Sequence, residues 1–557
     1  MKYYRLTAAL IVATLPLLAN ETNIITAGAG IQDIGITYDY RTDDNYAIYR
    51  WSNLFRDFEA RMAGVVTIGS NGRSISSMGP DSYLSISERK YFDAQKVVFE
   101  ADADGAITRL YFRGAVPVEI DAQADDWIKE VLLIAYHETP IGYLSKANTI
   151  LTEEGVIGLA EAADRTDNQS EAKTFLDVIL SQDINSGVAE IIAPIAGRVI
   201  SSSSGLAEYL LTISEKVPGT PELSTALFAA AGQINSSSEL RHVLIELTAS
   251  VPIDEAAAVE LVKSVEHISS SSEKSATVRR IAPYILEYDL AASALMDGML
   301  GISSSSEKSR AIQSIARLEM IDARNLARLA TVAGTISSSS ESRRALEATA
   351  VRGDNNDEYV AAYLKSANKI ESDSELSKTL ITLIDNVPLT GSQLAAVCRT
   401  SVAISSSSES RRALEATTKM GNNAEEYVAA CLLAAAEISS SSEHSQTLIS
   451  LVDQVPLTDS QLAAVCKEAA RLASSSDMAR VLVRIAQRYE LQTRSLSVFL
   501  KAVGANSSSS EQHRVLAVLL ERHTIPDESK QELLRTIRNI SSSSVREKLM
   551  DQIMGFK

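Results

Sequence analysis

Cysteine, histidine and aromatic residues are scarce in this chain. Its 557 residues include three Cys and six His, and aromatic residues make up 5%. Three cysteines exclude a small scaffold held together by disulfides. The hydrophobic fraction of 45% is ordinary for a folded protein, which excludes general disorder. Abundant Ala, Leu and Ser favour helices that pack through small residues over an all-β protein.

Positive charge is also in deficit. Lys and Arg together number 53 against 71 Asp and Glu, which gives a formal net charge of -18. This average charge repels a phosphate backbone, so we expect no nucleic-acid partner. Beyond residue 19, no stretch is long and apolar enough to span a bilayer, so we expect no membrane span once the leader is cleaved.

Sequence motifs for catalysis and metal binding are missing. No HExxH pair, GxSxG elbow or phosphate-binding loop is present. The cysteines are interpreted as small buried residues: Cys398, Cys431 and Cys466. Two pairs match the SxxK motif, Ser271 with Lys274 and Ser305 with Lys308, but both open a repeated unit and are interpreted as helix caps. We therefore predict a non-enzymatic protein that needs no cofactor and no metal.

The N-terminus has the pattern of an export signal. Lys2 and Arg5 form a short positive region, and the run from Leu6 to Ala19 is almost wholly apolar. This run is shorter than the roughly 20 apolar residues that a transmembrane helix needs. We therefore predict a signal peptide over residues 1–19 and an exported protein, located in the periplasm, on the outer cell surface or outside the cell.

After the predicted signal peptide, the hydrophobic pattern of the sequence is first that of strands and then that of helices. Residues 20–120 alternate between apolar and polar residues, and the dipeptides Asn71-Gly72 and Asp104-Gly105 are typical of hairpin turns. This pattern predicts a small antiparallel β-domain. Residues 121–165 then have helical periodicity with Trp127 as an apolar anchor, and they are predicted to form a helical connector.

From residue 166 to residue 557, one pattern recurs every 34 residues. Each unit opens on a version of Ile-Ser-Ser-Ser-Ser-Glu. The twelve starting residues are Thr166, Ile200, Ile234, Ile268, Ile302, Ile336, Ile370, Ile404, Ile438, Leu472, Asn506 and Ile540. Ten residues after each start stands a large aliphatic residue, from Leu176 to Met550. The period predicts a mainly α protein, a right-handed α-solenoid of about twelve two-helix repeats similar to HEAT and TPR arrays.

The serine run of each unit is predicted to cap the first helix. The side chains assigned to capping are Ser304 and Glu307, Ser406 and Glu409, and Ser440 and Glu443. In such a capping box, the hydroxyl accepts from one free backbone N–H and the carboxylate accepts from another. Stacking would place these helix starts along one edge, whose hydroxyls could also bind anions or carry O-linked sugars.

A longer repeat of 68 residues is also present. The stretch ISSSSESRRALEAT at 336–349 reappears at 404–417, and VPLTGSQLAAVC ending at Cys398 reappears as VPLTDSQLAAVC ending at Cys466. This indicates that a block of two repeats was duplicated.

The repeat opening resembles the Ile-Ser-Ser-Asp-Tyr-Glu-Lys repeats of uncharacterised exported bacterial proteins. Some of those repeats form the extracytoplasmic part of antirepressor-like zinc metallopeptidases. The N-terminal block is similar too, in Asn71-Gly72-Arg73-Ser74, Ser82-Tyr83-Leu84, Asp104-Gly105, Arg109-Leu110-Tyr111 and Trp127. The peptidase domain is absent, and most units replace the Asp-Tyr pair with Ser-Ser, although Asp373 keeps the acid. The resemblance implies export and a repeat fold, and it implies no activity.

Three classes of function fit these observations. The first is a protein-binding scaffold in the bacterial cell envelope or outside the cell, because solenoids present extended surfaces. The second is a self-assembling structural subunit of a filament or surface layer, because repeated surfaces can propagate contacts. The third is an enzyme with a site hidden in the β-domain, with the candidate acids Asp39, Asp43, Asp44 and Glu88, although solvated loop charges explain these acids more simply. We prefer the first class. The expected partner is another protein or a second copy of this chain.

Overall fold

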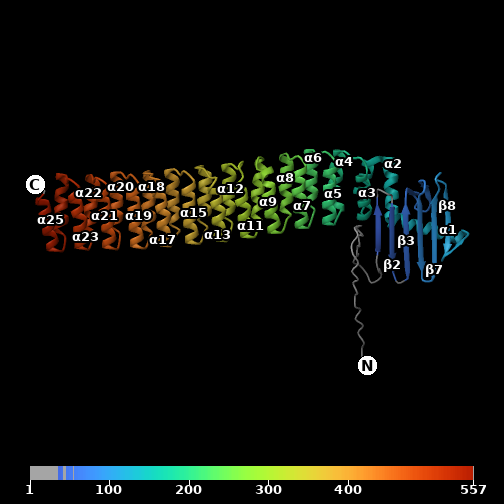
Figure 1. Cartoon of the computed structure of the whole chain (residues 1–557), viewed down its shortest axis with the longest axis horizontal. Helices are drawn as coiled ribbons and strands as arrows, with labels where there is room; N and C mark the ends of the chain where they lie inside the picture. Colours follow the sequence, from blue (N-terminus) through green and yellow to red (C-terminus); the bar gives the residue numbers. More distant parts are fainter. Residues whose placement is uncertain (1–35, 42–45, 54, 556–557) are drawn as a thin grey trace, which may run out of the picture. The chain divides into compact units, whose positions relative to one another are not determined.

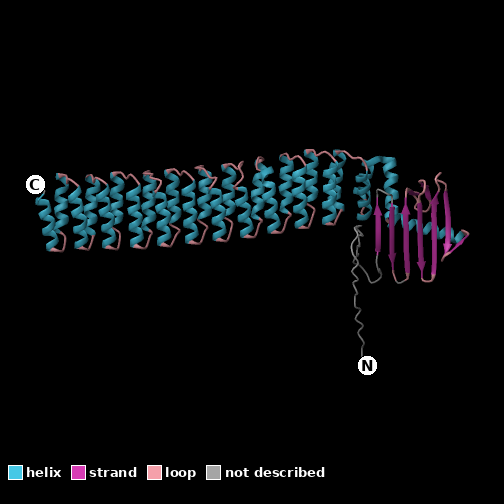
Figure 2. Cartoon of the chain, viewed as in Figure 1, coloured by secondary structure: helices cyan, strands magenta, loops and turns pink. Residues whose placement is uncertain are grey.

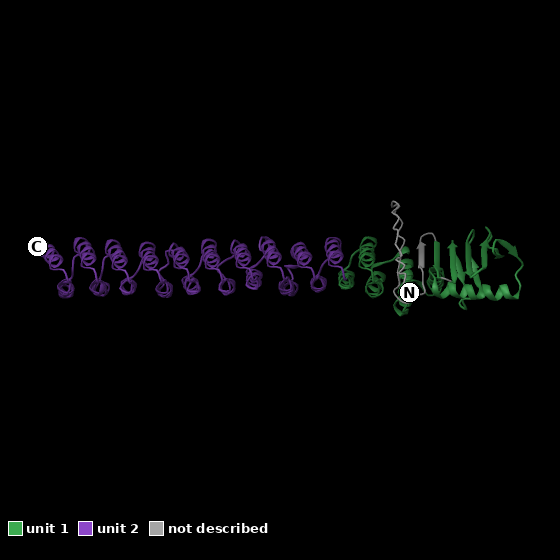
Figure 3. Ribbon diagram, turned by 90° about the horizontal axis from the view of Figure 1, so that it is seen from below, with its two compact units in different colours: residues 1–234 green, residues 235–557 purple. Residues whose placement is uncertain are grey.

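The computed structural model describes residues 36–41, 46–53 and 55–555. The chain divides into two compact units, residues 1–234 and 235–557 (Figure 3). The predicted signal peptide, residues 1–19, lies outside the described residues, as do Asp43 and Asp44. For Asp39, the backbone lies in a strand and the side chain is outside the description.

An antiparallel sheet opens the first unit (Figure 2). Its strands are β1 (Ile36–Arg41), β2 (Tyr46–Ser52), β3 (Arg56–Ala63), β6 (Tyr83–Lys90), β7 (Asp93–Ala101), β8 (Ile107–Arg113) and β9 (Val116–Val118), in that spatial order. Two further strands, β4 (Val66–Ile68) and β5 (Ile75–Met78), form a separate antiparallel ribbon. The antiparallel arrangement that the alternating sequence predicts is confirmed.

Two glycine turns connect strands of this unit. Gly105, with φ of +79°, lies in the turn between β7 and β8, where the Asp102 carboxylate accepts from the N–H groups of Asp104 and Ala106 at 3.0 and 2.8 Å. Gly72, with φ of +68°, lies between β4 and β5, and a Cβ there would stand 2.8 Å from Leu133 Cδ1. Both positions need glycine for its backbone freedom, and Gly72 also needs it for space.

One face of the sheet is covered by helix α1 (Ala122–Glu138). Every second residue of β3 and β6 is buried on this face, which is the burial expected of a strand with one covered side. The buried side chains of α1 and these strands include Phe58, Met62, Leu84, Ile86, Trp127, Ile128, Val131 and Leu132. The indole of Trp127 donates to Glu88 Oε2 at 2.8 Å and so ties α1 to β6.

Helix α2 (Pro140–Arg165) joins the sheet to the first repeats. Its Ser145 hydroxyl accepts from the N–H of Ile68 at 2.7 Å, and its Lys146 pairs with Glu171 of the next helix at 2.6 Å. Gly155, with φ of +74°, interrupts the helix. Helix α2 therefore contacts both the β4 strand and α3. The segment predicted as a connector belongs to the same compact unit as the sheet, and the division between the two units falls after Ile234.

The first unit ends with two helix pairs and the second unit is made of helices throughout (Figure 1). In the first unit these are α3 (Gln169–Ser181), α4 (Ser186–Val199), α5 (Ser203–Lys216) and α6 (Pro221–Ala231). In the second they are α7 (Ser237–Ser250), α8 (Glu255–Glu266), α9 (Ser271–Ile285), α10 (Asp289–Leu300), α11 (Ser305–Ile315), α12 (Ala323–Ala333), α13 (Ser339–Ala350), α14 (Asp357–Ala367), α15 (Asp373–Asn386), α16 (Gly391–Ser401), α17 (Ser407–Thr418), α18 (Glu425–Ala436), α19 (Ser441–Gln454), α20 (Asp459–Ala469), α21 (Ser475–Arg488), α22 (Thr493–Ala505), α23 (Ser509–Arg522), α24 (Asp527–Arg538) and α25 (Ser543–Gly555).

Within the second unit the helices form two layers, which Figure 3 shows end-on. Odd-numbered helices pack on odd-numbered neighbours and even-numbered helices on even-numbered neighbours, as α13 does on α15 and α12 on α14. Each repeat therefore supplies one helix to each layer and buries its apolar stripes against the adjacent repeat. The α-solenoid prediction is confirmed, and its right-handed sense stays a prediction.

The repeat period coincides with the helix starts. The first helix of every repeat, from α3 to α25, begins 34 residues after the previous one. The aliphatic residue ten positions into each repeat is at most 1% exposed in the first eleven repeats. In the last repeat Met550 is half-buried, and its neighbour Leu549 takes the buried place.

Candidate functional site

The serine-rich helix starts of the second unit are the candidate site. In the repeat that begins at Ile302, Ser304 lies immediately before α11, and its hydroxyl accepts from the N–H of Glu307 at 3.4 Å. Ser440 does the same before α19, accepting from the N–H of Glu443 at 3.4 Å. These side chains stand where the sequence assigns helix caps.

Ser406 occupies the same place before α17 with the same extended backbone, φ of -71° and ψ of 113°. Its hydroxyl makes no capping bond and lies 3.3 Å from the hydroxyl of Ser408 instead. Substitution of either hydroxyl group would therefore change the local serine contacts without removing a cap bond.

The carboxylates of the predicted capping boxes bind arginines instead of backbone. Glu307 pairs with Arg310 at 2.5 Å and Glu409 with Arg412 at 3.0 Å. Glu443 pairs with Arg411 of the preceding repeat. The sequence predicts that each carboxylate accepts from a backbone N–H at the start of its own helix, and this prediction is corrected. A nearby guanidinium is a stronger partner for a carboxylate than one N–H.

Full capping boxes do occur, but at second helices. Thr390 and Gln393 form one at the start of α16, and Thr458 and Gln461 form another at the start of α20. The spacing Thr-x-x-Gln is the sequence signal for these capping boxes.

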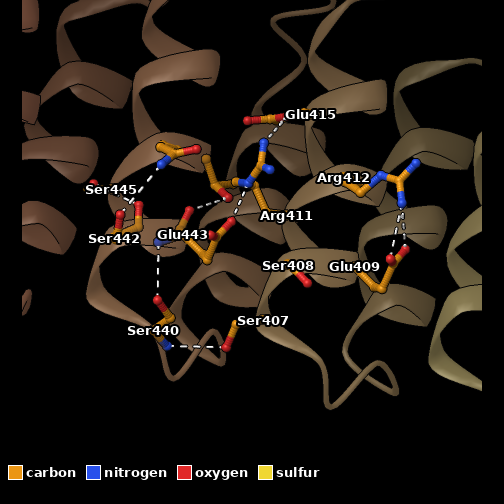
Figure 4. A network of polar contacts seen from close by, with 12 residues as sticks. Ser407, Ser408, Glu409, Arg411, Arg412, Glu415, Ser440, Ser442, Glu443 and Ser445 are labelled. Atoms are coloured by element: carbon orange, nitrogen blue, oxygen red, sulfur yellow. Dashed lines mark hydrogen bonds and ion pairs between the residues drawn. The ribbon is translucent and has the colours of Figure 1, made fainter.

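In most repeats of the second unit, the serine three residues after the repeat start bonds with the next repeat. Ser271 Oγ accepts from the N–H groups of Ser303 and Ser304 at 3.1 and 3.3 Å. Ser407 Oγ accepts from the N–H of Ser440 at 3.2 Å (Figure 4). It also lies 3.0 Å from Ser439 Oγ. We call this set of bonds between successive serine runs the serine ladder.

Asp373 takes the serine's place in one rung of the serine ladder. Its carboxylate accepts from Ser405 Oγ at 2.7 Å and from the N–H groups of Ser405 and Ser406 at 3.2 and 2.8 Å. The bond from Ser405 Oγ is the main reason that the pKa of Asp373 lies below its ordinary value. The acid that most units lack therefore contacts the next repeat, a role beyond capping its own helix.

A second set of contacts between repeats lies beside the serine ladder. Arg343 pairs with Glu375 of the following repeat, and Arg411 pairs with Glu443 of the following repeat (Figure 4). Arg411 also binds Glu415 of its own helix at 2.7 Å. The bond from Arg343 holds the pKa of Glu375 below its ordinary value.

The six predicted capping residues thus form no single pocket. Ser406 and Glu409 belong to the repeat next to that of Ser440 and Glu443, and the serine ladder and the Arg411 pair join these two repeats. Ser304 and Glu307 lie three repeats earlier and bond with the repeat of Ser271. This arrangement couples each repeat to its neighbour and carries no reaction chemistry.

The lysine and the serine of each SxxK pair have different hydrogen-bond partners. Lys274 Nζ donates to the carbonyl of Glu266 at 3.2 Å, and Lys308 Nζ donates to the carbonyl of Leu300 at 3.1 Å. Burial lowers the pKa of both lysines. Each ammonium group therefore binds the end of the preceding second helix and leaves its serine to the serine ladder.

Other titratable groups are buried without forming a reactive cluster. The three cysteines are free thiols in the helix core, and burial raises the pKa values of Cys398 and Cys466. Burial lowers the pKa of His444 to about 4, so this imidazole is neutral at pH 7. Among the described residues, no group of three or more His, Cys, Asp or Glu side chains could hold a metal ion.

Glu88 differs from its expected setting on a solvated loop. It lies in β6, is 4% exposed, and binds the guanidinium of Arg56 as well as the Trp127 indole. Lys90 adds a third donor at 3.4 Å. Strand alternation turns this carboxylate inward, so it holds the sheet and α1 together.

The described part of the chain contains no helix that could serve as a membrane span. No protein-family model matches the chain, and no curated protein matches it. Among solved structures, a circular tandem repeat protein with novel repeat topology and enhanced subunit contact surfaces is similar over 78% of this chain and 91% of its own, at 12% identity and a TM-score of 0.15. The fold itself defines the class: an α-solenoid protein with an antiparallel sheet ahead of its repeats.

Proposed function

We propose that this α-solenoid is an exported, non-enzymatic scaffold that binds a protein partner in the bacterial cell envelope or outside the cell. The observation that carries the proposal is the use of polar side chains in the second unit. The serine ladder and the Arg343–Glu375 and Arg411–Glu443 pairs join successive repeats to each other. The outer faces of the helices stay available, and solenoids bind partners through such extended faces.

Two further observations support a binding role over a catalytic one. Glu88, the one described side chain among the four candidate acids, is held by Arg56 and Trp127. Large apolar side chains stand exposed on the solenoid, among them Leu290, Val351 and Leu433. Exposed apolar side chains are more useful to a binding surface than to a reaction.

Export is tested at the N-terminus. The full chain, produced in a Gram-negative host, is fractionated and its N-terminus is read by mass spectrometry. We expect a periplasmic protein that begins at Asn20. A protein that keeps Met1 and stays in the cytoplasm contradicts the export part of the proposal.

The scaffold role is tested against self-assembly by light scattering after size-exclusion chromatography of residues 20–557. A monomer mass that stays constant across a concentration series supports the scaffold. Growth into large species as concentration rises favours a structural subunit, because repeated surfaces that match each other propagate into fibres.

A further inference from the structure

A groove of about 530 Å³ crosses the first helices of three successive repeats in the second unit. Its lining includes Arg317, Arg344 and Arg352, together with Glu347, Val351 and Thr382. The size lies within the range of about 300–1,000 Å³ that is typical of ligand sites. We call it the arginine groove.

Short helices open the arginine groove. Helices α11 and α13 have 11 and 12 residues, whereas α9 and α15 on either side have 15 and 14. Arg317 and Arg352 each stand two residues beyond the end of a short helix. Helices α11 and α13 are two to four residues shorter than α9 and α15, which leaves space beyond their ends, and Arg317 and Arg352 line this space.

Among the charged groups that line the arginine groove, some have an ion-pair partner and others have none. Glu347 accepts from Arg343 at 2.5 Å and from Thr382 Oγ1 at 3.3 Å, so its carboxylate is already paired. No ion pair involves Arg317 or Arg352 in the described part of the chain. The one bond between them joins Arg352 Nη2 to the carbonyl of Arg317 at 3.5 Å. Two guanidinium groups therefore face solvent in a protein whose net charge is -18.

The duplicated block offers an internal comparison. Arg344, Glu347 and Ala348 have the same residue types 68 positions later, at Arg412, Glu415 and Ala416. The two free arginines do not recur: Asp385 stands in place of Arg317, and Met420 in place of Arg352. If these arginines served only to cap the helix ends, both copies of the block would be expected to carry them. Only the first copy has the two arginines that lack an ion pair.

We propose that the arginine groove binds a short acidic peptide segment of the partner protein, with an apolar side chain of the peptide packed on Val351. Guanidinium groups bind carboxylates through paired N–H donors, and Val351 is 67% exposed between them. A bare phosphate is a poorer occupant, because it has no apolar group to pack on the exposed Val351. A sugar is also a poorer occupant, because no aromatic ring is among the described residues that line the groove.

The test uses the chain from residue 20 to 557 and a fluorescein-labelled probe peptide, Asp-Glu-Leu-Asp-Leu-Glu-Asp, followed by fluorescence anisotropy. The double variant R317Q/R352Q is compared with R494Q/R522Q, which makes the same change in charge at two exposed arginines outside the groove. We expect the first variant to weaken binding by about 10-fold or more and the second by less than about twofold. A third variant, R317K/R352K, keeps the charge and loses the paired donors, so its affinity should lie between those of the wild type and R317Q/R352Q.

Four results would overturn the assignment of the arginine groove. These are no binding of the probe peptide by the wild type, no effect of R317Q/R352Q, an equal loss in the control variant, and tighter binding of polygalacturonate than of the peptide. Unchanged circular dichroism and melting temperature would show that the variants fold.

This inference rests on the proposed scaffold function, and the two fail differently. A monomeric exported protein that cross-links to a partner elsewhere but ignores the peptide refutes the groove alone. A protein that polymerises or forms no cross-link to any partner refutes the scaffold.

Discussion

Asp373 offers the sharpest test of how the repeats are coupled. Its carboxylate accepts three hydrogen bonds from the start of the next repeat, at Ser405 and Ser406. Replacing Asp373 with Ala removes all three. Replacing it with Ser installs the residue that ten of the other eleven repeats carry at this position, and so provides a matched control.

The expected cost follows from the number of bonds and their exposure. A net contribution of about 0.5–1.5 kcal/mol for each bond, reduced because the site is partly solvated, gives about 1–2 kcal/mol for D373A. Since about 1.4 kcal/mol corresponds to a factor of ten, backbone amides around Ser405 and Ser406 should exchange with solvent roughly 10-fold faster. Hydrogen-exchange mass spectrometry of the peptide that spans these residues measures this directly. D373S should exchange at close to the wild-type rate.

The pH dependence has a definite sign. Because the pKa of folded Asp373 lies below its ordinary value of 3.8, its contribution to stability is present above pH 3.8 and is lost as the pH falls through the lowered value. The difference between wild type and D373A should therefore shrink in acid. Equal exchange in all three proteins at pH 7 would refute the reasoning, because the hydrogen bonds would then contribute nothing.

Three further predictions concern burial. L414A should lower the free energy of unfolding by about 3 kcal/mol in urea, and M550A by about half or less, because Leu414 is fully buried and Met550 is not; equal losses would contradict the packing. E88Q should cost about 2 kcal/mol and shift the fluorescence of Trp127, because an arginine loses its charged partner, and an unchanged spectrum would refute this contact. The three cysteines should resist Ellman's reagent in the native protein and all react in denaturant, because they are buried, and fast native labelling would show otherwise.

The sequence predicted the repeat architecture because a period repeated twelve times leaves little freedom. A serine run before an apolar stripe fixes each helix start, and the aliphatic residue ten positions later fixes the buried face, as at Leu414. The antiparallel sheet followed from alternation and from the turns at Gly72 and Gly105. These features depend on neighbours within one repeat or one hairpin.

Contacts between repeats were harder to predict, because they join residues about 32 positions apart. Glu307 and Glu443 have capping-box spacing, yet each binds an arginine, and the partner of Glu443 lies in another repeat. The constant spacing between Arg411 and Glu443, repeated between Arg343 and Glu375, is a signal that could have revealed these pairs. The arginine groove has no such signal, because it depends on where two helices end.

The burial of Glu88 was missed for a related reason. A carboxylate in an alternating strand was assigned to a solvated loop, although the alternation itself turns it toward α1. Its partners, Arg56 and Trp127, come from β3 and α1, and only the folded sheet brings them together.

Site-specific photo-cross-linking tests most directly whether the solenoid binds a partner protein. A photoreactive amino acid is placed at Val351 or Leu433, which are 67% and 71% exposed, in cells that produce the full chain. We expect a discrete adduct with a different protein in the exported fraction from at least one of these sites. Adducts only between copies of this chain, or none at either site, would contradict partner binding.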